Sequence, residues 1–73
     1  MTNLRILRKK RRISQVGLQM ATGIDQSLIS KYERGERLPT AQMLVLLADF
    51  FRVSTDFLLD RTDVETPYPP KGR

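Results

Sequence analysis

The side chains best suited to chemistry lie close together near the middle of the chain and carry amide, hydroxyl and cationic groups. They are Gln26, Ser27, Ser30, Lys31 and Arg34. These groups donate and accept hydrogen bonds. The chain contains no His and no Cys, so acid–base or nucleophilic chemistry would rest on scattered carboxylates and lysines with no evident pairing. We therefore expect recognition through hydrogen bonds, and we expect no enzyme, metal site, cofactor or small-molecule ligand.

A short helix, predicted from Gln26 to about Arg34, places these groups on one side. Ile29 and Tyr32 lie on the opposite side, where they can enter a core. Asp25 is a good N-cap for this helix, and Gly35 ends it. The polar face is then free to meet a partner.

A second capped helix comes directly before the first, from Gln15 to about Thr22. Ser14 is its N-cap, and Gly23 allows a sharp turn because glycine adopts the left-handed conformation at little cost. Leu18 and Ile24 supply apolar contacts between the two helices. Two capped helices joined by a glycine turn within about twenty residues have the spacing of a helix-turn-helix.

Three further helices are predicted around this pair. They run from 4 to 12, from 41 to about 52 after the N-cap Thr40, and from the N-cap Ser54 to near Asp60. The predicted core side chains of these segments are Leu4, Leu7, Ile13, Leu44, Leu47, Ala48 and Phe51. The sequence thus predicts an all-α domain of five helices over residues 1–61. Residues 62–73 contain three prolines and little apolar content, and we expect a Pro-rich, disordered tail.

Positive charge is concentrated in the first half of the chain. The net charge of +5 arises from +6 in residues 1–37, −2 in residues 38–60 and +1 in the remainder. A basic face of this kind favours a polyanion, although solvated charge runs are common. The sequence has no secretory signal and no apolar run of the roughly 20 residues that span a bilayer. We expect a cytoplasmic protein that does not enter a membrane.

Several motifs occur together over about residues 3 to 60. They are ISQ at 13–15, the turn glycine Gly23, QSLISKYERGERLPT at 26–40, LADFF at 47–51 and VSTDFLLD at 53–60. With these motifs the chain resembles the Cro and phage-repressor type of helix-turn-helix transcriptional regulators, also called the xenobiotic-response-element family. The resemblance implies a lambda-repressor-like fold and sequence-specific binding of double-stranded DNA, with repression as the expected outcome. The tail is either a linker to a sensor domain or the end of a minimal repressor, and we expect the latter.

The resemblance assigns base reading in the major groove to Gln26, Ser27 and Lys31, with Ser30 as a weaker candidate. Gln can bond to N6 and N7 of adenine, and Lys can donate to O6 and N7 of guanine. The resemblance also assigns a phosphate contact to Gln15. The cationic side chains that could reach further phosphates are Lys9, Lys10, Arg11, Arg12, Arg34 and Arg37.

The family also pairs an arginine and a glutamate at the positions of Arg8 and Glu33, which we expect to form a structural ion pair. The chain departs from the family at Gln19 and Thr22, where a small and an apolar residue are usual. Gly17 lies inside a predicted helix, where glycine costs about 0.5 to 1 kcal/mol relative to Ala. The two-helix contact is therefore expected to be looser or shifted.

An additional apolar row follows the helix after residue 40. Met43, Leu46 and Phe50 form this row, and Phe57 and Leu59 could extend it. They either complete the core of a small domain or form the interface of a homodimer, at least on DNA, that binds a palindromic operator. The alternative function is a protein-interaction module, such as an antitoxin-like helix-turn-helix protein that binds a protein partner.

Overall fold

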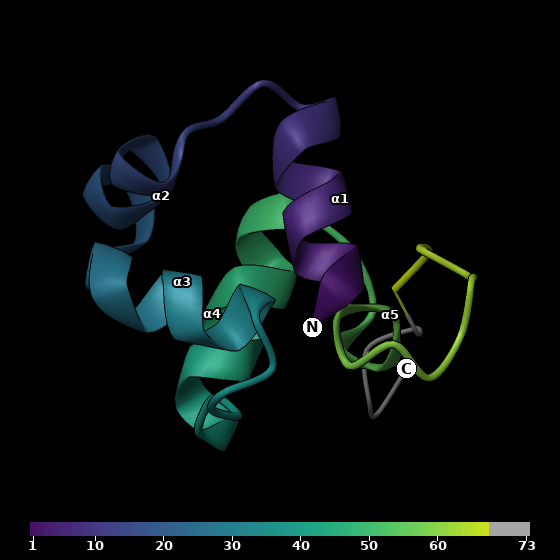
Figure 1. Ribbon diagram of the computed structural model, residues 1–73. Coiled ribbons are helices and arrows are strands. Elements are labelled where there is room, and N and C mark those ends of the chain that lie inside the picture. Colours follow the sequence, from purple (N-terminus) through teal and green to yellow (C-terminus); the bar gives the residue numbers. More distant parts are fainter. Residues whose placement is uncertain (68–73) are drawn as a thin grey trace.

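The computed structural model describes residues 1–67, and Figure 1 shows their arrangement. This part of the chain contains five helices and no strand, which confirms the predicted all-α fold. The helices are α1 (Thr2–Lys10), α2 (Gln15–Thr22), α3 (Gln26–Glu33), α4 (Ala41–Phe51) and α5 (Thr55–Leu58). None of them is long and apolar enough to cross a membrane.

Local capping determines where most of these helices begin. The side chains of Ser14, Thr40 and Ser54 each accept a hydrogen bond from the backbone N–H three residues later, at 2.9, 3.2 and 3.0 Å. Gly23 and Gly35 follow α2 and α3 with φ angles of +79° and +74°, which glycine adopts without steric cost. The predicted N-caps are therefore correct.

The first helix begins two residues earlier than predicted because a residue distant in sequence caps it. The carboxylate of Asp60 accepts hydrogen bonds from the backbone N–H groups of Thr2 and Asn3, each at 2.8 Å. The Asn3 side chain also donates to the carbonyl oxygen of Phe57 at 2.8 Å. The same helix ends at Lys10, two residues earlier than predicted, and Arg12 then adopts a positive φ of +57°.

The core forms where the five helices meet. Its predicted members Leu4, Leu7, Leu18, Ile24, Ile29, Tyr32, Leu47, Ala48 and Phe51 are all buried. Ile13 and Leu44 are half-buried and pack against this cluster. Met1, Val53, Phe57 and Leu58 complete it. These contacts hold the five helices in fixed positions, because burial of each large apolar side chain stabilises the fold by about 1.5 to 3 kcal/mol.

The packing leaves one side of the helix-turn-helix uncovered by other helices. The structure places α2 and α3 against each other, with α1 over α3 and α5, and α4 against α2 and α5. In Figure 1, α2 and α3 form one flank of the molecule, and α5 lies at the opposite flank. The flank formed by α3 is therefore open to a partner.

Part of the predicted tail contacts the helical domain. The backbone N–H of Ser54 donates to the carbonyl oxygen of Glu65 at 2.8 Å, and its hydroxyl donates to that of Val64 at 3.2 Å. The Glu65 carboxylate also lies 3.5 Å from Nζ of Lys10. The predicted tail extends beyond this contact, and its residues 68–73 lie outside the described residues.

Candidate nucleic-acid interface

The polar face of α3 is directed toward solvent. Gln26, Ser27 and Lys31 are exposed, and Ser30 is half-buried. Ile29 and Tyr32, on the opposite face, have exposed fractions of 0% and 1%. Burial of the apolar face fixes the orientation of α3, so the hydrogen-bonding groups face outward.

These side chains line one shallow hollow with a volume of about 410 Å³. The hollow is lined by Gln15, Gln26, Ser27, Ser30, Lys31 and Arg34. Every one of these residues was predicted from the sequence to contact either bases or phosphates. The structure thus brings the predicted residues of α2 and α3 together on one surface.

A second hollow shares part of this lining and adds Arg5, which the sequence motifs did not indicate. It is lined by Arg5, Gln15, Ser30, Glu33 and Arg34. Arg5 precedes Arg8 by three residues, so both lie on the side of α1 that faces α3. That spacing, read together with the predicted contact of Arg8 with Glu33, would have identified Arg5.

The first turn of α3 is held by Asp25. The Asp25 carboxylate accepts hydrogen bonds from the backbone N–H of Ser27, at 3.0 Å, and from the Ser27 hydroxyl. Both bonds stabilise the ionised carboxylate and so hold the pKa of Asp25 below its usual value. The bond from the Ser27 hydroxyl has the larger effect on this pKa, and the bond from the Ser27 N–H the smaller. Asp25 therefore fixes both the backbone and the side chain of Ser27.

The two departures from the family pattern form hydrogen bonds, Gln19 from α2 to the start of α3 and Thr22 within α2 and the turn that follows it. Oε1 of Gln19 accepts a hydrogen bond from the backbone N–H of Gln26 at 2.7 Å. The Thr22 hydroxyl donates to the carbonyl oxygen of Leu18 at 2.7 Å and accepts from the N–H of Ile24 at 3.2 Å. The turn is therefore closed by polar bonds at positions where the family uses small and apolar side chains.

Gly17 leaves room for the N-cap of its own helix. A Cβ atom at this position would lie 3.1 Å from Oγ of Ser14, the atom that accepts the N–H of Gly17. A side chain here would therefore press on the capping hydroxyl. This crowding offsets part of the stabilisation that Ala would otherwise bring to a helix interior.

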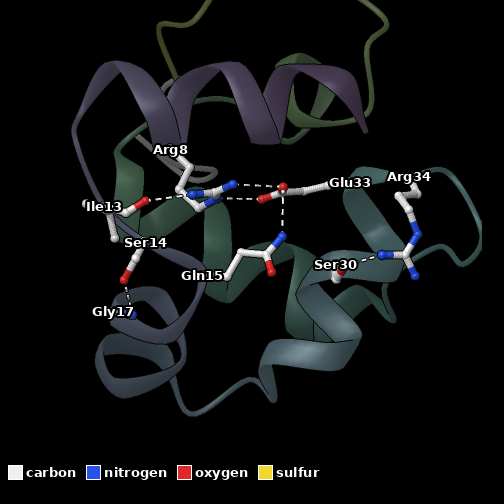
Figure 2. A network of polar contacts seen from close by, with 8 residues as sticks. All are labelled: Arg8, Ile13, Ser14, Gln15, Gly17, Ser30, Glu33 and Arg34. Atoms are coloured by element: carbon white, nitrogen blue, oxygen red, sulfur yellow. Dashed lines mark hydrogen bonds and ion pairs between the residues drawn. The ribbon is translucent and has the colours of Figure 1, made fainter.

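A buried ionic network joins α1, α2 and α3 behind the hollow (Figure 2). Arg8 donates to both oxygens of Glu33, at 2.6 and 3.0 Å, and to the carbonyl oxygen of Ile13 at 2.9 Å. The side-chain amide of Gln15 donates to Oε1 of Glu33 at 3.2 Å. The hydrogen bond to Glu33 raises the pKa of Arg8 above its usual value. Gln15 is thus oriented by the pair that the family resemblance predicted.

Arg34 borders the hollow and is held by its neighbours. Its guanidinium donates to both carboxylate oxygens of Glu36 and to the Ser30 hydroxyl, as Figure 2 shows for Ser30. Glu36 raises the pKa of Arg34, and Arg34 lowers that of Glu36, each through their hydrogen bond. Both side chains are about half exposed, so a phosphate oxygen can compete with the Glu36 carboxylate for the guanidinium.

The four consecutive cationic residues 9–12, at the end of α1 and just after it, have different surroundings. Lys10 pairs with Glu65, and the guanidinium of Arg11 lies over the ring of Phe51, 5.6 Å from its centre. Lys9 and Arg12 are exposed, as is Arg37 after α3. Two of the four predicted phosphate contacts at 9–12 therefore already have partners within the chain.

The apolar row of α4 is divided between the core and the surface. Met43 is half-buried, with its sulfur accepting a hydrogen bond from the Tyr32 hydroxyl at 2.9 Å, and Phe57 is buried in the core. Leu46 and Phe50 are 43% and 39% exposed. Leu59 is half-buried. An interface on this side would therefore depend on Leu46 and Phe50.

Comparisons with known proteins agree with the geometry. The Helix-turn-helix family model matches residues 4–58. The chain is 38% identical over 55 residues to an uncharacterised HTH-type transcriptional regulator, YazB of Bacillus subtilis, covering 75% of this chain and 80% of YazB. It is 42% identical over 59 residues to the cryptic phage CTXphi transcriptional repressor RstR of Vibrio cholerae, covering 78% of this chain and 53% of RstR.

A third relative is an uncharacterised HTH-type transcriptional regulator, YobD of Bacillus subtilis, 36% identical over 64 residues, or 88% of this chain and 57% of YobD. The chain thus spans little more than half the length of RstR and YobD. No solved structure matches it. The matches confirm the resemblance to Cro and phage-repressor type regulators that the motifs indicated. The chain belongs to the helix-turn-helix family.

Proposed function

We propose that this protein is a transcriptional regulator that binds a specific sequence of double-stranded DNA by placing α3 in the major groove. One observation carries the proposal: the residues lining the hollow on α2 and α3 all have side chains suited to bases or phosphates. The major groove of B-DNA is about 12 Å wide and admits an α-helix. The proposal is also supported by the relatives, whose names describe transcriptional regulators.

Base reading is assigned to the outward groups of α3. The Gln26 amide can both donate to and accept from adenine, and the Lys31 ammonium can donate to guanine. Ser27 and Ser30 lie between them on the same exposed face. Three contacts keep α3 rigid, namely Gln19 and Asp25 at its start and Arg8 on Glu33 at its end. Rigidity lowers the entropy that is lost on binding.

Phosphate contacts are assigned to the rim of the same surface. Gln15 and Arg34 line the hollow, and Arg5 lines the adjoining one. Lys9, Arg12 and Arg37 are exposed outside the hollows and are the candidates for further phosphate contacts. Such contacts position the protein on DNA without reading its sequence. Lys10 and Arg11 would first have to leave Glu65 and Phe51 to join them.

We further propose that the protein binds a palindromic operator as a homodimer and represses transcription by occlusion. Leu46 and Phe50, together with Val45, are exposed apolar side chains on α4 that are available for a symmetric contact. A dimer of this class reads two half-sites about 34 Å apart, one turn of DNA. The name of the similar RstR, a phage repressor, supports repression as the outcome.

Selection from random duplexes followed by a salt titration tests the proposal. The expected result is one enriched palindrome whose affinity falls about tenfold for each doubling of salt, as contact with about four phosphates would require. Enrichment of no sequence would contradict specific binding. Affinity that does not change with salt would contradict an interface built on phosphate contacts.

A further inference from the structure

We propose that Ser27 acts only as a hydrogen-bond acceptor toward DNA and thereby selects a base whose amino group lies in the major groove, adenine or cytosine, on the strand it faces. This inference rests on the proposed function and adds the chemistry of one operator position. The observation behind it is the contact of the Ser27 hydroxyl with the carboxylate of Asp25, at the exposed first turn of α3.

The direction of this hydrogen bond follows from the chemistry of its two partners. A serine hydroxyl has one proton and two lone pairs, whereas an ionised carboxylate can only accept. The single proton of Ser27 must therefore point to Asp25, and the lone pairs of Oγ remain for another donor. The backbone N–H of Ser27 also donates to the same carboxylate oxygen, at 3.0 Å, so two bonds hold this arrangement.

Asp25 remains ionised at neutral pH. Its pKa lies below its usual value because of the hydrogen bonds from the hydroxyl and amide of Ser27, and the positive charge of Lys31 lowers it further. The approach of DNA phosphates would raise this pKa, but the unperturbed value of Asp is about 3.9, three units below neutrality. The carboxylate therefore keeps its role as acceptor beside the duplex.

An acceptor distinguishes the two kinds of base edge in the major groove. Adenine presents its N6 amino group and cytosine its N4 amino group, both of which donate. Guanine presents O6 and thymine O4, both of which accept and would face the lone pairs of Ser27 without a proton between them. A hydroxyl that was free to rotate would tolerate either kind of base.

Ser30, one turn later, has a different environment and provides a matched control. The guanidinium of Arg34 donates to Oγ of Ser30, and arginine cannot accept a hydrogen bond in return. The proton of Ser30 is therefore not committed to a carboxylate. Removal of this hydroxyl should not affect the choice of base opposite Ser27.

The test measures dissociation constants of the 73-residue chain for its selected operator and for all four base pairs at each position. For the wild type, one position per half-site should favour adenine and cytosine over guanine and thymine on one strand by about five- to tenfold, the effect of about one hydrogen bond. In Ser27→Ala this preference should fall to within about twofold. Ser30→Ala should leave the amino-over-keto ratio at this position unchanged, whatever its effect on total affinity.

Asp25→Asn provides a second variant that keeps the N-cap, because Asn caps helices as well as Asp. A carboxamide can donate to Ser27 as well as accept, which frees the proton of the hydroxyl and should reduce the amino-over-keto ratio. The ratio is unaffected by any uniform gain in affinity from the lost negative charge. Circular dichroism of each variant verifies that the helices are retained.

Two results would overturn the inference while leaving the proposed function intact. One is an enriched operator whose amino-over-keto preference is the same in Ser27→Ala as in the wild type. The other is a Ser27-dependent position that favours guanine or thymine. Failure to enrich any sequence would instead overturn the proposed function, and this inference with it.

Discussion

Arg8 and Glu33, separated by 25 residues in the chain, form a buried two-point ion pair that joins α1 to the last residue of α3. Arg8 is 8% exposed as a residue, and the side chain of Glu33 is 3% exposed. Since the third donor of Arg8 reaches the carbonyl oxygen of Ile13, both charges are well satisfied. The pair holds the end of α3 and orients Gln15 beside it.

Arg8→Ala should therefore destabilise the protein much more than Lys9→Ala. Removal of Arg8 leaves the Glu33 carboxylate buried without its cation, which costs about 3 to 5 kcal/mol in comparable sites. Lys9 is exposed on the same helix, and its replacement should change the free energy of unfolding by less than about 0.5 kcal/mol. Urea denaturation measures the free energy of unfolding of both variants. Equal midpoints for Arg8→Ala and Lys9→Ala would contradict a stabilising role for the ion pair.

A matched pair of arginines separates stability from DNA binding. Arg12 and Arg52 both adopt positive φ angles, +57° and +58°, just after α1 and α4. The backbone N–H of each arginine donates to the carbonyl oxygen three residues earlier, Arg12 to Lys9 and Arg52 to Asp49. The N–H of the residue that follows each arginine donates to the carbonyl oxygen five residues before that following residue. A side chain costs about 1 to 2 kcal/mol in this conformation, and the extra entropy that glycine loses on folding offsets about 0.5 to 1 kcal/mol of this, so Arg12→Gly and Arg52→Gly should each stabilise the fold by up to about 1 kcal/mol.

The two variants should differ in how DNA affinity depends on salt. Each phosphate contact contributes about 0.9 to the slope of log K against log salt, so Arg12→Gly should reduce the slope by about this amount for each bound chain. Arg52→Gly should leave the slope unchanged, because Arg52 lies outside the proposed interface. A salt titration with an operator duplex measures the slopes, and equal slopes in both variants would remove Arg12 from the interface.

The Asp25 carboxyl should titrate below the usual value for Asp, and Ser27→Ala should raise its pKa, because the Ser27 hydroxyl is the largest cause of the shift. NMR titration of the carboxyl carbon measures both values. Since the folded pKa is depressed, the associated stability is present above the unfolded pKa, near 3.9, and is lost as the pH falls through the folded value. An unchanged pKa in Ser27→Ala would show that this hydrogen bond is absent in solution.

Phe50→Glu should weaken self-association if the exposed apolar side of α4 forms the dimer interface. Phe50 is 39% exposed beside Leu46, and a carboxylate there would be desolvated on dimer formation. Met20→Glu is the control, because Met20 is 82% exposed on α2 and is not part of the proposed contact on α4. Analytical ultracentrifugation with operator DNA should detect two chains per duplex for Met20→Glu and a loss of the second chain for Phe50→Glu. Two chains per duplex for both variants would place the interface elsewhere.

Features determined by local sequence were predicted well. Ser14, Asp25, Thr40 and Ser54 cap the helices that follow them, because a capping side chain bonds to a backbone amide only two or three residues away. Apolar periodicity likewise identified the buried side of α3, and therefore its exposed side. The exposed positions of Gln26, Ser27 and Lys31 follow from that pattern alone.

Features that depend on distant residues were missed. No local signal indicates that Asp60 caps the start of α1, that Arg11 lies over Phe51, or that Glu65 lies near Lys10. The role of Gln19 was also missed, because its family position suggested a looser contact while its length allows it to reach the amide of Gln26. Pairings of this kind are set by tertiary packing, which periodicity cannot specify.

A comparison of the operators that the wild type and Gln26→Ala select from random duplexes tests whether this face of α3 reads bases. Because the Gln26 amide is exposed at the first turn of α3, its removal should relax the preference at one base pair per half-site and weaken the best site by about 1 to 3 kcal/mol. Arg34→Ala, in contrast, should weaken all sequences alike. Identical selected operators for the wild type and Gln26→Ala would contradict base reading by this face of α3.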